Sequence, residues 1–270
     1  MEMDPAQSTP AHTQKSAAVE LTAIILTLNE ASHIVDCIAS LDWADRVVVF
    51  DSFSIDGTID LAQQAGAEIY QHPFANYAQQ RNAALDAVDT DWVFFVDADE
   101  RGTPDLGAEI LRVIGRGNEP ACAERGWNVP RRNYIFGKLT TGAGWFPDYQ
   151  LRLFKHGLVR YEREVHEIAQ VEGAIGDLQH PLIHYNYAEI EQFKAKQRAY
   201  TSFDARMLKD EGVRPRPHNF ILQPLRQFLW RYITLQGYKD GWHGLQLSLF
   251  MMYYEWVKYR KLAWFWRKER

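Results

Sequence analysis

The clearest candidates for chemistry are two carboxylates, Asp97 and Asp99, which follow the apolar segment 92–96. This segment is rich in aromatic and β-branched residues and predicts a buried strand. Two acids at one strand end repel each other unless a cation lies between them. Oxygen ligands suit Mg²⁺ or Mn²⁺, and an ion held by few carboxylates usually also binds substrate phosphates, so the pair indicates a metal and phosphate site. A solvated acidic turn is the alternative for the pair taken alone.

The elements that must position these acids follow from an alternation of patterns between residues 22 and 116. The sequence predicts strands at 22–28, 46–50, 68–70 and 92–96 and helices at 30–41, 56–65, 77–87 and 103–114. Alternating strands and helices form right-handed βαβ units around a parallel sheet, with ligands at the carboxyl ends of the strands. We therefore expect Asn29, Asp51 and the two aspartates to lie along one edge of this sheet.

The pattern changes after residue 117. Strands are expected at 126–134 and 149–154, separated by a glycine-containing loop at 137–145. A long helix is expected at 189–211, and two aromatic-rich helices, at about 219–236 and 244–265, follow the breaks at Pro215 and Pro217.

Composition limits the class of protein. The chain has 270 residues with 46% hydrophobic residues, which suits one large α/β domain with an appendage. Its two cysteines, Cys37 and Cys122, form no disulfide framework or metal cluster, so a reducing compartment fits best. Residues 1–20 are polar and predict a disordered tail with no secretory signal.

Charge is distributed unevenly along the chain. The net charge is −5, yet residues 214–270 contain eleven Lys/Arg and three acids, a balance of +8 that leaves −13 for the first 213 residues. Five of the nine tryptophans also lie in this basic region. A basic, aromatic end on an acidic body indicates a surface partner, and we expect no nucleic acid among the partners.

Membrane binding is one interpretation of this end. The apolar stretch 245–257 is too short to span a bilayer, which needs about 20 residues. Residues 258–268 interleave cations with aromatics, which is typical of a helix that lies in an interface over anionic lipid. A helix that docks on the rest of the chain, or one that mediates self-association, is the alternative.

Four segments carry a resemblance to a known family. They are Ile-Ile-Leu-Thr-Leu-Asn-Glu at 24–30, Val-Val-Val-Phe-Asp-Ser at 47–52 with Asp-Gly-Thr at 56–58, Gln-Arg-Asn-Ala-Ala at 80–84, and Asp-Ala-Asp at 97–99. In this order and spacing they resemble the family 2 glycosyltransferases, enzymes of the GT-A fold that use nucleotide-diphospho-sugars. The segments 147–154, 165–167 and 241–244 resemble more narrowly the branch of lipopolysaccharide-core and other bacterial cell-surface glycosyltransferases.

The resemblance covers roughly residues 20–205 and implies a fold class and a domain organisation. The fold class is α/β, a GT-A fold with a Rossmann-like, mostly parallel sheet and an aromatic, basic, helical C-terminal extension. The catalytic domain would occupy residues 21–213, with a nucleotide-binding half at 21–116 and an acceptor half at 117–213. Residues 214–270 would form the extension.

The resemblance also implies a donor site. Asp51 would accept a hydrogen bond from the uracil N3–H, with Thr27, Asn29 and Glu30 in the same region. Arg81 could reach the diphosphate, because planar guanidinium suits phosphate oxygens. An N-cap or Asx-turn role for Asp51 and a plain surface role for Arg81 are the alternatives.

The metal and the base complete the expected site. The resemblance implies that Asp99 binds the metal directly, that Asp97 touches ribose or metal, and that His184 is a further ligand; a structural role for His184 remains open. An inverting transfer needs a base for the acceptor hydroxyl. Glu167 matches the family position best, and Asp148 is the second candidate.

The predicted function is an inverting, metal-dependent glycosyltransferase that moves a sugar from a nucleotide-diphospho-sugar to a lipid-linked or lipopolysaccharide-core glycan. A UDP-sugar is the favoured donor. The enzyme would act in the cytoplasm, peripherally on the inner face of the cytoplasmic membrane. Haloacid-dehalogenase phosphatases fit worse, because their pattern wants Thr or Val where Arg101 stands. Nucleotidyltransferases need a glycine-rich loop that is missing after Leu28. An inactive carbohydrate-binding scaffold is the remaining alternative.

Overall fold

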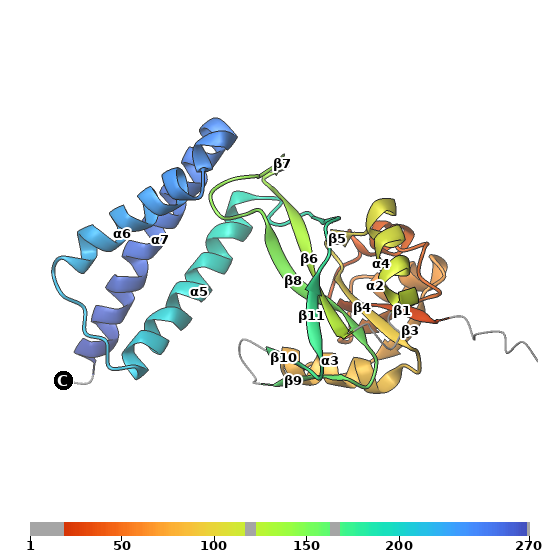
Figure 1. The fold of residues 1–270 in the computed structure, drawn as a ribbon. Coiled ribbons are helices and arrows are strands. Elements are labelled where there is room, and N and C mark those ends of the chain that lie inside the picture. The colour runs from red at the N-terminus through yellow and green to blue at the C-terminus, as the bar shows by residue number, and fades with distance from the viewer. Residues whose placement is uncertain (1–18, 117–122, 163–167, 269–270) are drawn as a thin grey trace, which may run out of the picture.

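The computed structural model describes residues 19–116, 123–162 and 168–268, and its layout is given in Figure 1. Its first half is a parallel sheet of order β3-β2-β1-β4. The strands are β1 (Leu21–Thr27), β2 (Arg46–Asp51), β3 (Glu68–Gln71) and β4 (Trp92–Asp97). The connecting helices are α1 (Ile34–Ala39), α2 (Thr58–Gln64) and α3 (Tyr77–Ala87). The predicted βαβ alternation is therefore confirmed.

The helix predicted at 30–41 was wrong in length, since α1 begins only at Ile34. The cause is the loop after β2, whose side chains bind the backbone N–H groups that a helix start would use. Asn29 donates to Ser54, and Ala31 donates to Asp56. Asn29 also adopts a left-handed backbone conformation with φ of 58°, which a regular helix does not allow. Residues 28–33 therefore form a loop between β1 and α1, at the edge of the sheet where the candidate site lies.

The central strands read as continuous apolar runs because helices cover both faces of the sheet. Alternate residues enter two different cores, as strand geometry requires. In β4, Trp92 and Phe94 pack with α1, α2 and α4 (Pro104–Arg116), whereas Val93 and Phe95 pack with α3. All four side chains are fully buried. This double burial holds the end of β4, and with it Asp97, in a fixed place.

A mostly antiparallel half, in which β11 and β12 pair parallel with β6, continues the sheet in the order β4-β8-β6-β12-β5. Its strands are β5 (Glu100–Arg101), β6 (Glu124–Ile135), β8 (Asp148–Lys155) and β12 (Leu182–His184), and β7 (Lys138–Leu139) and β11 (Ala174–Asp177) also pair with β6. β9 (Val159–Glu162) and β10 (Ile168–Val171) form a separate ribbon. The candidate metal site lies where the parallel and antiparallel halves meet.

Three long helices form a layer on the other side of this antiparallel half (Figure 1). They are α5 (Ile190–Asp210), α6 (Asn219–Leu229) and α7 (Gly241–Arg267), and α7 packs against both of the others. Phe193 of α5 shares a buried cluster with Leu247 and Tyr254 of α7. The helix predicted at 219–236 is broken: α6 ends at Leu229 and continues as the π-helical turn η1 (Trp230–Thr234) and the 3-10 turn η2 (Gly237–Asp240).

The loop 140–145 fastens the helical layer to the sheet. The carboxylate of Asp240 accepts hydrogen bonds from the backbone N–H groups of Thr141 and Gly142. A side chain at Gly244 would overlap with the carbonyl of Gly237, so the start of α7 can approach η2 only because residue 244 is glycine.

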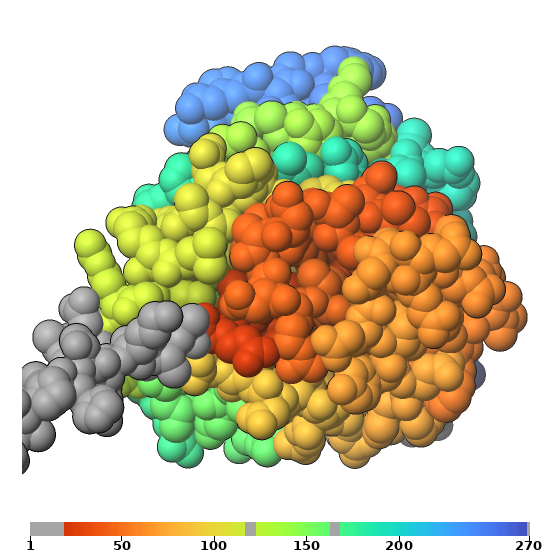
Figure 2. Space-filling view, turned by 90° about the vertical axis from the view of Figure 1, so that its right-hand side faces the viewer, coloured from red at the N-terminus to blue at the C-terminus, as the bar shows by residue number. Residues whose placement is uncertain are grey.

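The opposite face of the molecule is formed largely by β1 to α3, coloured red to orange in Figure 2, with α6 and α7 visible only at its upper edge. In the described part of the chain, no helix combines the length and the apolar character that crossing a bilayer requires.

Candidate active site

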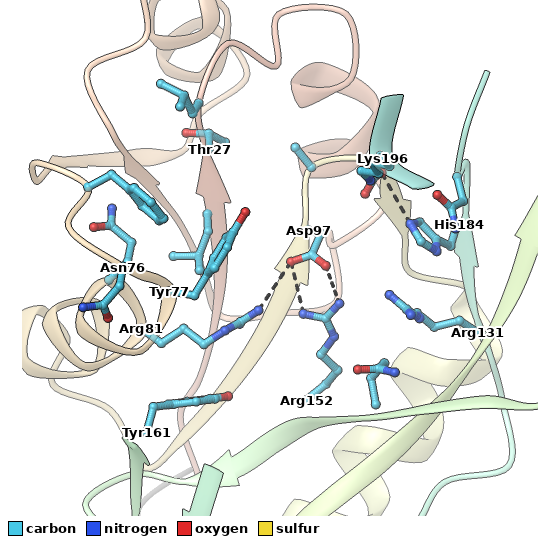
Figure 3. A pocket seen from close by; sticks show the side chains of 18 of the residues that line it. Thr27, Asn76, Tyr77, Arg81, Asp97, Arg131, Arg152, Tyr161, His184 and Lys196 are labelled. Carbon is cyan, nitrogen blue, oxygen red and sulfur yellow. Dashed lines mark hydrogen bonds and ion pairs between the residues drawn. The ribbon is translucent and has the colours of Figure 1, made fainter. Parts of the chain in front are cut away.

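A cleft of about 1700 Å³ opens at the carboxyl ends of β1 and β4. Its walls come from the sheet, from the start of α3 and from α5. Seven of the predicted site residues line it, namely Thr27, Glu30, Arg81, Asp97, Asp99, Asp148 and His184. Residues more than 150 positions apart in the sequence therefore meet in one cavity, part of which is drawn in Figure 3.

Asp97 lies between two guanidinium groups (Figure 3). Arg152 of β8 donates from Nη1 to Oδ1 over 3.1 Å and from Nη2 to Oδ2, and Arg81 Nη2 lies 3.7 Å from Oδ1. Burial alone would raise the pKa of Asp97, but the charge of Arg152 and its hydrogen bonds outweigh it and hold the pKa well below its ordinary value. Asp97 is therefore ionised and already paired with cations.

The fully buried carboxylate of Glu100 supports this arrangement through hydrogen bonds to Asp97 and to two arginines. Its Oε2 accepts from the backbone N–H of Asp97 over 2.9 Å. Its Oε1 accepts from Arg152 over 2.8 Å and from Arg131 over 3.1 Å. A buried carboxylate needs such partners, because an unpaired charge in the interior is costly. Glu100 thus fixes the two arginines that face the cleft.

Asp99 and His184 face each other across the cleft floor, with 3.4 Å between Oδ2 and Nε2. Nδ1 of His184 lies 2.7 Å from Oδ1 of Asn133. Burial would raise the pKa of Asp99, but the hydrogen bond and charge of His184 outweigh it, so the pKa is lowered. A carboxylate and an imidazole nitrogen are both ligands for divalent metals.

Among the residues that the structure describes, no group of three or more His, Cys, Asp or Glu side chains could hold a metal ion. Asp99 and His184 are a pair of such donor groups, with 3.4 Å between Oδ2 and Nε2. A set this small fits a cation that keeps waters and completes its shell with substrate phosphates, as Mg²⁺ typically does.

Asp148 is engaged by several donors. Its Oδ2 accepts from Arg131, with 3.0 Å to Nε, and from Asn133 over 3.2 Å, and its Oδ1 accepts from Gln150 over 3.0 Å. Burial would raise its pKa, but the charge of Arg131 and these hydrogen bonds outweigh it and lower the pKa. A carboxylate stabilised in this way is a weak proton acceptor.

Asp51 is fully buried at the end of β2 and does not line the cleft itself. Its carboxylate accepts from the hydroxyl of Thr27, over 2.9 Å, and from the backbone N–H of Ser54, over 2.8 Å. Asn29 accepts from the backbone N–H of Ile55 over 3.0 Å. The structure thus brings Asp51 next to Thr27, with Asn29 in the neighbouring loop.

Glu30 lines the same cleft as Asp99 and His184. Its backbone N–H donates to the hydroxyl of Thr58 over 2.8 Å. Burial raises the pKa of its carboxyl, and the nearby charges of Asp99 and Asp56 raise it further.

Comparison with known proteins decides the family. The sequence model described as Glycosyl transferase family 2 matches residues 22–161, slightly more than half of the chain. The chain is a family 2 glycosyltransferase. The match includes the edge residues of β1, β2 and β4 and the charged positions of α3 and β8, so the resemblance inferred from the sequence is confirmed.

Curated relatives of this glycosyltransferase extend the comparison beyond the family segment. The lipopolysaccharide core biosynthesis glycosyltransferase LpsC of Rhizobium meliloti is 32% identical over 83% of this chain and 84% of its own. An uncharacterized glycosyltransferase of Rickettsia felis is 25% identical over 90% of this chain and 89% of its own. Because they cover 83% and 90% of the chain, both alignments extend into the helical layer at least as far as α5.

A solved structure supports the fold. Glucosyl-3-phosphoglycerate synthase from Mycobacterium tuberculosis, in complex with phosphoglyceric acid, gives a TM-score of 0.50 over 73% of this chain and 82% of that chain, with 17% identity. The predicted GT-A class, with its mostly parallel sheet and helical extension, is confirmed.

One predicted residue of the glycosyltransferase lies outside the described part of the chain, and three residues of the cleft were not predicted from the sequence. Glu167, the first candidate for the base, lies outside the described residues. Arg131, Arg152 and Lys196 line the cleft but were not predicted as site residues. Arg152 carried a usable signal, since an arginine in the apolar strand Leu-Arg-Leu-Phe at 151–154 must pair with a carboxylate if the strand is buried.

Proposed function

We propose that this glycosyltransferase is inverting and metal-dependent. It transfers a sugar from a nucleotide-diphospho-sugar in a single displacement at the anomeric carbon, and a UDP-sugar is the favoured donor. The observation that carries the proposal is the pair Asp99 and His184, 3.4 Å apart, beside an aspartate held by Arg81 and Arg152. A cation site next to fixed guanidinium groups suits a diphosphate.

For the donor, Arg81 binds the diphosphate and Asp97 orients it through the ribose or the metal. Asp51 would accept from the base next to Thr27. Its Oδ1 already accepts from the hydroxyls of Thr27 and Ser54, whereas its Oδ2 accepts from the backbone N–H of Ser54 and has a second lone pair for uracil. Glu30 would border the donor in the cleft, with Asn29 in the neighbouring loop.

Asp99 and His184 would hold the cation, Mg²⁺ or Mn²⁺, with Asp97 close by. When bound, such an ion neutralises the charge that develops on the departing nucleotide diphosphate. The residues suit it because Oδ2 of Asp99 and Nε2 of His184 lie 3.4 Å apart, and the hydrogen bond that Nδ1 of His184 donates to Oδ1 of Asn133 fixes the imidazole in this orientation.

Glu167 accepts the proton of the acceptor hydroxyl in this proposal. The low pKa of Asp148 favours this choice, because Arg131 and Asn133 stabilise the ionised form of Asp148 and so weaken it as a base. Asp148 remains the second candidate, since it borders the cleft.

The acceptor is a lipid-linked or lipopolysaccharide-core glycan, met at the inner face of the cytoplasmic membrane, to whose anionic surface the protein binds peripherally. The similarity to LpsC, which is named for lipopolysaccharide core biosynthesis, supports this acceptor class. The basic charge of residues 214–270 supports an anionic surface as partner.

A donor screen tests the proposal. The thermal midpoint of the protein is measured with UDP-, GDP-, ADP- and CDP-sugars, each with and without Mn²⁺. Stabilisation by a UDP-sugar that requires the metal is expected, because a ligand that binds only the folded state raises its stability. Equal shifts with all four nucleotides, or shifts that ignore the metal, would contradict it.

A further inference from the structure

The outward face of α6 and η1 is apolar. Ile221, Leu222, Leu225, Leu229 and Ile233 are all exposed, with 70% of Ile221 and 57% of Ile233 accessible to solvent. They recur every three or four residues, so they share one face of the helix. A helix on the surface of a water-soluble domain normally turns such a stripe inward.

The other face of α6 already has its partner. Pro224 is buried, and Phe220 packs with Tyr259 and Leu262 of α7. The rings of Phe220 and Tyr259 lie with their centroids 6.5 Å apart. In Figure 1, α6 forms the outer edge of the helical layer, and the exposed fractions of its aliphatic side chains show that the stripe is open to solvent.

Exposed aromatic and cationic side chains precede, interrupt and follow the stripe along the chain. Trp242 is 75% exposed at the start of α7, and Trp230 is exposed at the start of η1. Between Glu211 and Asp240 the sequence contains no acidic residue. It contains five cations there, of which Arg214, Arg216, Arg226 and Lys239 are exposed. Aliphatic residues flanked by tryptophan and arginine are typical of a helix that lies in the interface of an anionic bilayer.

Two lysines of the basic end of α7 already have partners within the protein. Lys261 donates to the carbonyl of Arg198 and to the hydroxyls of Thr201 and Ser202, all on α5. Lys258 pairs with Glu255 at 2.7 Å. Lys261 thus fastens α7 to α5, and Lys258 is paired within α7. Arg260 and Arg267 of α7 and the following Lys268 are exposed, but the exposed aliphatic stripe belongs to α6 and η1.

We infer that α6 and η1 dock on an anionic membrane through this apolar stripe, which we call the α6 face (Ile221, Leu222, Leu225, Leu229 and Ile233). The inference rests on the proposed function in one respect: at the membrane the protein would meet its lipid-linked acceptor. The charge of the surrounding surface selects a lipid bilayer over a second copy of the chain, because two such basic faces would repel each other.

A direct connection links the α6 face to the cleft. Arg231 of η1 donates to the carbonyl of Ala143 over 2.6 Å, and the backbone N–H of Ala143 donates to Leu235 over 2.8 Å. The next residues of that loop, Gly144 and Trp145, line the cleft. A membrane that contacts α6 and η1 would therefore be connected, through η1, to the loop that borders the cleft.

Vesicle co-sedimentation of the full chain tests the inference. The probes are vesicles of phosphatidylglycerol with phosphatidylethanolamine, and vesicles of phosphatidylcholine alone. The wild-type protein is expected to sediment with the anionic vesicles and to be released by salt. The double variant Leu222→Gln/Leu225→Gln should bind roughly tenfold more weakly or worse, because it removes two aliphatic side chains that the lipid would bury.

Matched controls separate the possible outcomes. Leu111→Gln/Ile175→Gln removes two exposed aliphatic side chains far from α6 and should bind as the wild type does. Arg260→Gln/Lys268→Gln should have the smaller effect; the reverse order would overturn the assignment to α6. A dimer without vesicles that Leu222→Gln/Leu225→Gln dissociates, seen by light scattering, would also overturn it. Metal-dependent UDP binding without vesicles should be equal in all these variants, so failure of membrane docking is distinguishable from failure of the proposed function.

Discussion

Asn133 fixes the orientation of His184. The amide nitrogen of Asn133 donates to the carbonyl of Trp145 over 2.7 Å and to Asp148 over 3.2 Å, so its oxygen is the atom that faces His184. Nδ1 of His184, 2.7 Å away, must therefore be a donor. Nε2 is left facing Oδ2 of Asp99, and only a positive centre, either a proton or a metal ion, can lie favourably between them.

Loss of this support should weaken metal binding. We predict that Asn133→Leu lowers the affinity for Mn²⁺, measured by calorimetry in the presence of UDP, by roughly 10- to 100-fold, the usual effect of losing a hydrogen bond to a ligating histidine. Asn128→Leu on the same strand, where the amide pairs with Asp177 on the surface, is the control and should leave the affinity unchanged. Equal affinities in both variants would show that Asn133 does not support a metal ligand.

The two candidate bases are separable by kinetics. Glu167→Gln should retain donor binding but lower turnover by roughly 10²-fold or more, the usual scale for a positioned base. Asp148→Asn should have the smaller effect on turnover, because the pKa of Asp148 is lowered by its partners. Steady-state rates with a saturating donor check this, and the reverse order of effects would move the base to Asp148.

Asp148 should also shape stability in acid. Its pKa is lower in the folded protein than in the unfolded chain, where an aspartate titrates at about 3.9. Its contribution is therefore complete above that value and is lost as the pH falls through the lower, folded pKa. Urea midpoints measured from neutral pH down to about pH 2 should fall more steeply for the wild type than for Asp148→Asn. Parallel curves would contradict the prediction.

Glu100 should matter for folding more than any surface acid. We predict that Glu100→Gln lowers the free energy of unfolding by about 3 kcal/mol, because Arg131 and Arg152 lose their shared buried counter-charge. Glu68→Gln breaks a partly exposed pair with Arg46 and should cost less than about 1 kcal/mol. Denaturant titration compares them, and similar losses would mean that the buried network is not the stabilising element.

Local patterns were enough to predict the parallel half of the sheet. Apolar runs of strand length, polar residues at their ends and helices between them placed Asn29, Asp51 and Asp97 along one edge, because parallel βαβ units leave few other arrangements. The short start of α1 was missed because its backbone is captured by side chains that lie 25 to 28 residues later.

The rest depends on contacts between distant segments. Arg152 reaches Asp97 only because β8 pairs antiparallel with β4, a pairing that hydrophobic periodicity does not encode. The helical end was predicted as helical, but the periodicity of 219–233 cannot say which face turns outward. That choice is made by α7, which covers Phe220 and Pro224 and leaves Leu225 exposed.

The central claim is that Asp99 supports metal-dependent sugar transfer, and release of labelled sugar from a panel of nucleotide-diphospho-sugars tests it most directly. The wild type should release sugar from a UDP-sugar with Mn²⁺ or Mg²⁺, and EDTA should abolish this activity. Asp99→Ala should be inactive yet as stable as Asp86→Ala, which removes an exposed acid of α3 that pairs with Arg160. Wild-type rates in Asp99→Ala, or in EDTA, would contradict the account.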